Sequence, residues 1–76
     1  MYVYMDNKAD EKVRKKLGAQ LKAAREEAGL TQAQLAAKAK VNANYYAVVE
    51  RGEGNLSVEK LQRIMKVLNI KSLEML

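Results

Sequence analysis

Residues 30–52 of this chain, LTQAQLAAKAKVNANYYAVVERG, constrain its fold more than any other stretch. Thr31 is suited to cap the start of a helix, and the glutamine three residues later can return the hydrogen bond and complete a capping box. Asn42 is a second residue of the type that caps helix starts. The stretch therefore predicts two short helices, residues 32–39 and residues 43–51, separated by a tight turn.

Apolar residues follow the helical period on both predicted helices. Ala36 is small, which suits two helices that cross at about 90–120° after a short turn, because their backbones approach closely. Val41 is an isolated apolar residue in the turn, placed to plug the core. We expect the buried positions of this unit to be Leu35, Ala36, Ala39, Val41, Tyr46 and Val49. Two short helices joined in this way are typical of proteins that read DNA.

The rest of the chain also indicates an all-α fold. The 76 residues suffice for one domain, and they include no proline and only four glycines. We expect a loose tail at 1–8 and a compact domain at 9–76 with five helices. These helices are expected at about 8–28 or 10–28, 32–39, 43–51 and 58–68, with a short terminal helix within 70–76. Their apolar stripes would bury Leu17, Leu21, Ala24 and Ala28 in the first helix and Val58, Leu61, Ile64, Met65 and Leu68 in the fourth.

The composition argues against several classes of function. Without cysteine the chain forms neither disulfides nor thiolate metal sites, and without histidine it lacks the commonest metal ligand and general base. We therefore expect no metal, no cofactor and no enzymatic activity. The apolar run MYVYM at the N-terminus is too short for a signal sequence or a membrane span. This predicts a cytoplasmic protein that makes no membrane contact, from a bacterial, archaeal or phage source.

The net charge of +5 favours a polyanionic partner, because released counterions drive such binding. The alternative is that these charges only solvate helix faces. Four lysines of the first predicted helix are open to either interpretation: Lys12, Lys15, Lys16 and Lys22.

Two strings, LGAQLKAAREEAGLTQAQLA and VNANYYAVVERGEGNLSVEKLQRIMKVLNI, resemble the lambda-repressor-like, XRE-type helix-turn-helix family over residues 13–76. The segment ERGEGNLSVEKL is similar to small controller regulators of restriction–modification operons. The resemblance implies a sequence-specific regulator, a repressor or autoregulator, that binds double-stranded DNA as a homodimer. It further implies that residues 43–51 form a recognition helix in the major groove.

The resemblance also implies roles for single positions. Gln32 matches a glutamine that meets a phosphate, and Arg25 and Glu50 match a buried, structural ion pair. The positions that match base-facing ones are Asn42, Ala43, Asn44, Ala47 and Val48. Further phosphate contacts are expected from Lys40, Tyr45, Arg51 and Asn55.

The recognition helix departs from the family pattern, which usually shows Arg, Gln, Ser or Thr at base-facing positions. Here Asn44 is the only strong hydrogen-bonding side chain, and asparagine pairs with adenine, whereas alanine and valine contact thymine methyl groups. This favours a half-site that contains A·T pairs. The alternative is that the helix reads few bases and that DNA shape and phosphate contacts supply most of the affinity.

The C-terminal apolar residues have two explanations. A short chain has difficulty burying all of them, and the family often dimerises through its last helix, which favours a dimer interface. Alternatively, they close the core of one domain. These residues are Ile70, Leu73, Met75 and Leu76. A second function also fits the apolar surfaces, namely a protein-interaction or antitoxin-type module on the same fold, with a protein partner and weak DNA binding.

Overall fold

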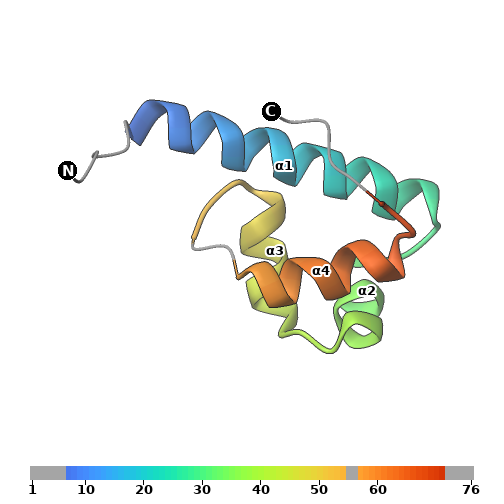
Figure 1. Ribbon diagram of the computed structural model, residues 1–76. Helices are drawn as coiled ribbons and strands as arrows, with labels where there is room; N and C mark the ends of the chain where they lie inside the picture. Colours follow the sequence, from blue (N-terminus) through green and yellow to red (C-terminus); the bar gives the residue numbers. More distant parts are fainter. Residues whose placement is uncertain (1–6, 55–56, 72–76) are drawn as a thin grey trace.

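The computed structural model describes residues 7–54 and 57–71. In this part of the chain the secondary structure consists of four helices and no strand (Figure 1). The helices are α1 (Asn7–Glu27), α2 (Gln32–Ala39), α3 (Ala43–Glu50) and α4 (Val58–Val67). The expected all-α class is therefore confirmed for the described residues.

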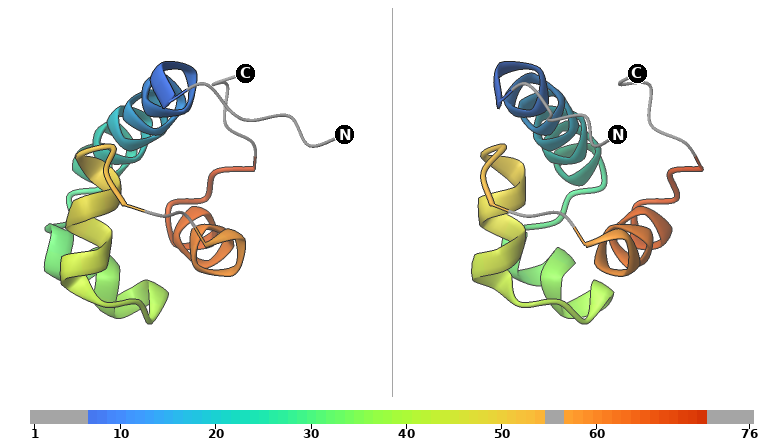
Figure 2. Two further views of the ribbon diagram at one scale, coloured as in Figure 1. Left: turned by 90° about the vertical axis from the view of Figure 1, so that its left-hand side faces the viewer. Right: turned by 60° about the vertical axis from the view of Figure 1, so that its left-hand side comes forward.

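The two shortest helices form the centre of the fold. α2 contacts both α3 and α4, and α1 packs against α3. In the turned views of Figure 2, α4 lies on the opposite side of the core from α3. The N-terminal turns of α1 extend past the other helices (Figure 1).

Local capping explains where α2 and α3 begin. The Thr31 hydroxyl accepts a hydrogen bond from the backbone N–H of Gln34 at 3.0 Å. In return, the Gln34 side-chain oxygen accepts one from the backbone N–H of Thr31 at 2.9 Å. The Asn42 side-chain oxygen accepts from the backbone N–H of Tyr45 at 3.0 Å. Between the helices Lys40 takes the left-handed conformation, with φ 58° and ψ 44°. The capping signals therefore predicted both helix starts correctly.

The core lies where the four helices meet. It is built from Leu17, Leu21, Leu35, Ala36, Ala39, Tyr46, Val49 and Ile64. Val41 packs against this cluster from the turn, as its position in the sequence predicts. Two expected core residues are exposed: Ala28 follows the end of α1, and Val58 is 72% exposed. Five others are only half-buried, namely Ala24, Val41, Leu61, Met65 and Leu68. Val58 lies about 120° around the helix from the fully buried Ile64, which takes it off the core-facing side.

Both ends of the domain differ from the expectation. α1 begins at Asn7, one residue before the earlier of the two expected helix starts, and so includes the end of the expected tail; no glycine or proline interrupts residues 7–17. The count of five helices is not supported. Asn69 adopts a left-handed φ of 58° after α4, and Ile70 and Lys71 are not helical. Residues 1–6 and 72–76 lie outside the described residues.

The helices within 7–54 and 57–71 lack the combination of length and apolar composition that crossing a membrane requires. The same residues contain no acidic cluster of the kind that holds a metal ion.

Candidate nucleic-acid interface

α3 has one buried face and one open face. Tyr46 and Val49 are fully buried on the core side. Of the residues expected to face DNA bases, Asn42, Ala43 and Asn44 are exposed, whereas Ala47 and Val48 are half-buried. The five residues thus share the open side of α3 and its N-terminal cap.

These five residues are not equally available to a ligand. The oxygen of the Asn42 side chain caps the helix, so this residue has only its two amide N–H groups left to donate. No hydrogen bond within the described part of the chain engages the Asn44 side chain, which leaves its donor and acceptor free. Val48 is partly covered by the loop after α3, because a Cβ at Gly54 would lie 2.8 Å from its Cγ1 methyl group. Asn44 is therefore the most accessible polar side chain on this face.

Behind this face, one buried carboxylate joins three helices. The Glu50 side chain is 4% exposed and accepts two hydrogen bonds from the Arg25 guanidinium, at 2.5 and 3.3 Å. It also accepts from the Tyr46 hydroxyl at 2.5 Å and from the Gln32 amide nitrogen at 2.9 Å. We call these four residues, Arg25, Gln32, Tyr46 and Glu50, the Glu50 cluster.

The hydrogen bonds of the Glu50 cluster fix its protonation states. Burial by itself raises the pKa of Glu50, but hydrogen bonds from Arg25, Tyr46 and Gln32 and the charge of Arg25 outweigh it and hold that pKa below its ordinary value. Burial, together with the hydrogen bond to Glu50, raises the pKa of Tyr46. The hydrogen bond to Glu50 raises the pKa of Arg25. At neutral pH the cluster thus holds an ion pair and a neutral phenol.

Two members of the cluster make bonds that the sequence did not indicate. Gln32 was expected to meet a phosphate, and it stands half-buried at the first position of α2 with one amide N–H directed at Glu50. A glutamine amide has two N–H groups, so one remains for a ligand. Tyr46 was expected to pack in the core, where it lies, but its hydroxyl also contacts Glu50.

Tyr45 ties α3 to the start of α4. Its hydroxyl oxygen accepts from the backbone N–H of Ser57 at 3.1 Å, and the Nζ atom of Lys60 lies 4.6 Å from the centre of its ring. The hydroxyl proton of Tyr45 remains available for donation. Lys60 thus stands beside α3, a position that the helical pattern of α4 alone does not reveal.

The turn and the loop that flank α3 differ in charge. Lys40 is exposed, and Arg63 of α4 holds its turn by donating to the carbonyl oxygens of Ala39 at 3.0 Å and of Lys40 at 3.4 Å. Arg51 is exposed just after α3 and pairs with Glu53 at 3.3 Å, which offsets its charge. Asn55 lies outside the described residues.

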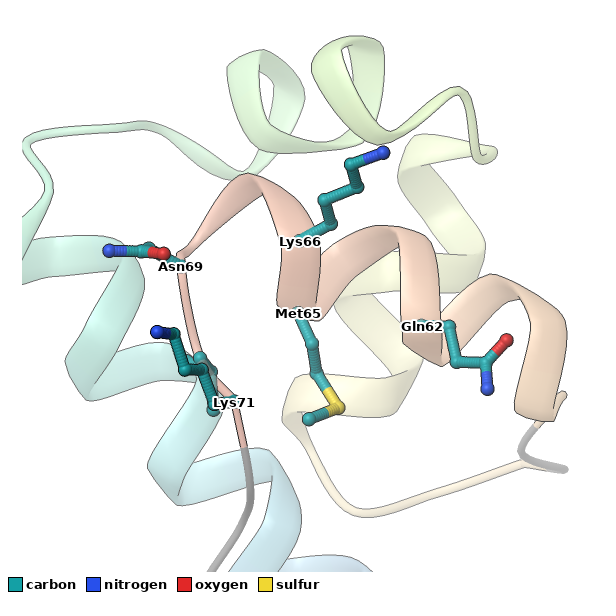
Figure 3. Close-up of a pocket in the computed structure, with 6 residues that line it drawn as sticks. Gln62, Met65, Lys66, Asn69 and Lys71 are labelled. Carbon is teal, nitrogen blue, oxygen red and sulfur yellow. The ribbon is translucent and has the colours of Figure 1, made fainter.

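Of the residues expected at a dimer interface, only Ile70 is described. It is half-buried and packs against the core, which agrees with the explanation that the C-terminal apolar residues close the core of one domain. It also lines a hollow of about 330 Å³ at the end of α4 (Figure 3), together with Gln62, Met65, Lys66, Asn69 and Lys71. Leu73, Met75 and Leu76 lie outside the described residues.

Comparison with known proteins places this geometry in a family. The helix-turn-helix family model HTH_3 matches residues 21–76. The crystal structure of the clp gene regulator ClgR from Corynebacterium glutamicum superposes with a TM-score of 0.71 at 33% sequence identity. The match covers 75% of this chain but only 61% of the ClgR chain, so this chain spans less than two thirds of that protein. No curated protein matches the chain.

The family match covers α2, α3 and all four residues of the Glu50 cluster, and the matched structure is that of a gene regulator. The chain belongs to the XRE-type helix-turn-helix family of DNA-binding transcription regulators.

Proposed function

We propose that this protein is a homodimeric, sequence-specific regulator of transcription, a repressor or autoregulator, that acts in the cytoplasm on double-stranded DNA. The observation that carries the proposal is the open face of α3, where the Asn44 side chain, which no other described residue engages, stands beside a well-capped helix start. Helix starts of this type enter the major groove in helix-turn-helix proteins. ClgR is a regulator of clp genes, and its role agrees with this class of activity.

In this proposal a few side chains read bases and others hold the DNA backbone. Asn44 pairs with adenine through its amide, and the methyl groups of Ala43, Ala47 and Val48 contact thymine methyl groups. Gln32 donates to one phosphate through its second amide N–H. Tyr45, Lys40 and Arg51 supply further phosphate contacts, to which we add Lys60 because of its place over the Tyr45 ring. Asn55 keeps its expected phosphate role.

The homodimer is proposed to form at the end of α4. The hollow that Met65 and Ile70 line is continuous in sequence with the apolar Leu73, Met75 and Leu76. A symmetric dimer reads two half-sites about one helical turn apart, so the operator should be a palindrome.

A protein-interaction module of the antitoxin type is the second candidate. The observation in its favour is apolar surface outside the core, because Ala43 is exposed on α3 and Val58 is 72% exposed at the start of α4. Such surfaces occur where a protein partner binds.

Selection of bound duplexes from a random DNA library, at about 150 mM salt, tests the proposal, because this salt weakens nonspecific phosphate binding. We expect enrichment of a palindrome with A·T pairs in each half-site. Failure to enrich any sequence, together with co-purification of one defined protein partner, would favour the interaction module instead.

A further inference from the structure

Glu50 is the last residue of α3, yet its carboxylate is the point where α1, α2 and α3 meet. Its four hydrogen bonds come from Arg25 on α1, Gln32 on α2 and Tyr46 on its own helix. A carboxylate has about four acceptor positions, so this group is saturated. Gln32 is the one member of the Glu50 cluster that also borders the proposed DNA face.

We propose that Glu50 is a positioning residue for DNA binding, because it orients the Gln32 amide toward the phosphate backbone. The inference rests on the proposed function and deepens it. The Gln32 amide nitrogen donates one N–H to Glu50 Oε1 at 2.9 Å. This bond holds the side chain in one rotamer, so the other N–H points in a single direction. A donor that is ordered before binding avoids the entropy cost of ordering on contact.

Arg25 makes this arrangement compatible with a phosphate. A lone carboxylate behind the Gln32 amide would repel the approaching anion. The Arg25 guanidinium contacts both oxygens of Glu50, and its own side chain is only 11% exposed, so the two charges offset each other at close range. The buried ion pair therefore serves the phosphate contact as well as the fold.

Gln34 provides a control within the same helix. It is exposed, and its side-chain oxygen accepts from Thr31, but its amide nitrogen makes no hydrogen bond within the described residues. The bond to Glu50 should make the Gln32 amide less mobile than the amide of Gln34, and the response of the second Gln32 N–H to added DNA separates a positioning role from a purely structural one.

The first test uses the unmodified protein and NMR of its side-chain amide groups. We expect the Gln32 N–H that faces Glu50 to exchange with solvent roughly tenfold more slowly than the Gln34 amide, since it is bonded to a buried charge. Added duplex DNA should shift the NMR resonance of the other Gln32 amide proton and leave the resonance of the bonded proton unchanged. Equal exchange at Gln32 and Gln34, or loss of the slow proton when DNA binds, would overturn the inference.

The second test is a double-mutant cycle of duplex affinity for Gln32→Ala and Glu50→Gln, each measured where circular dichroism shows a folded chain. If Glu50 acts through Gln32, the double variant binds duplex about as weakly as Glu50→Gln alone. In the control cycle, any change in duplex affinity caused by Gln34→Ala should be the same in the wild type and in Glu50→Gln. If the fold-losses in duplex affinity of Gln32→Ala and Glu50→Gln multiply in the double variant, this inference is overturned but the proposed function is not. A wild-type chain that binds no duplex would instead overturn the proposed function. If Glu50→Gln does not fold, the shift of the second Gln32 amide proton on addition of duplex to the wild type still decides.

Discussion

Gly18 lies where α1 closely approaches the end of α3, and replacing it by alanine should destabilise the protein. A Cβ atom at this position would lie less than 3 Å from the backbone carbonyl oxygens of Val49 and Glu50. These atoms belong to the end of a helix and have little freedom to move aside. In an exposed helix the same change stabilises by about 1 kcal/mol, so the structure predicts the opposite sign from helix propensity.

The size of the effect follows from two opposing contributions. Overpacking a core costs about 1–3 kcal/mol, and we expect the upper half of this range because the obstacle is backbone. After subtracting about 1 kcal/mol for the better helix former, the net loss is about 1–2 kcal/mol. For a domain of this size that lowers the melting temperature by roughly 4–16 °C.

Thermal unfolding followed by circular dichroism measures this loss. The control is Ala19→Gly, which exchanges the same residue types at the next, exposed position of α1 and should cost about 1 kcal/mol. Both substitutions should therefore destabilise the protein, although they run in opposite directions. A Gly18→Ala protein that melts at or above the wild-type temperature would refute the close approach of α1 and α3.

Three further predictions concern charge and base reading. The lowered pKa of Glu50 means that this residue stabilises the fold above its unfolded pKa of about 4.3, and that the stabilisation is lost as the pH falls through the folded pKa. Unfolding curves between pH 7 and pH 3 should show this loss, and Glu50→Gln should lack that part of the pH dependence. Asn44→Ala should relax the preference at one base pair per half-site by about 1–3 kcal/mol in competition binding, and an unchanged preference would exclude Asn44 as a reader. Lys60→Met should lower the slope of log affinity against log salt by about 1 without changing sequence preference, while Lys12→Met on the solvent side of α1 should leave the slope unchanged.

The parts of the fold that depend on neighbouring residues were predictable from the sequence. Thr31, Asn42 and Ser57 cap their helices through bonds to residues three positions later, so the sequence contains both partners side by side. The stops at Lys40 and Asn69 depend on a single left-handed residue each. The exposure of Val58 was not foreseen, because an apolar residue at the start of a helix fits several faces of a short pattern.

The Glu50 cluster depends on how helices cross, and no short-range pattern encodes that crossing. The pairing of Arg25 with Glu50 came from the family resemblance and not from spacing in this chain. The bond from Gln32 follows only once α2 and α3 are placed in space, whereas the bond from Tyr46 spans four residues of α3, a spacing that the sequence contains. Gly18 was missed for the same reason, since a glycine inside a helix looks merely unfavourable until the neighbouring helix is in position.

The central claim is that the open face of α3, with Gln32 and Lys60 at its borders, is the surface that binds DNA. Chemical-shift mapping of the labelled protein with an enriched palindromic duplex tests this most directly. We predict that the largest backbone shifts fall within residues 42–48, with side-chain shifts at Gln32 and Lys60. Shifts confined to the hollow at the end of α4, around Met65 and Ile70, or no shifts at saturating duplex, would contradict the account.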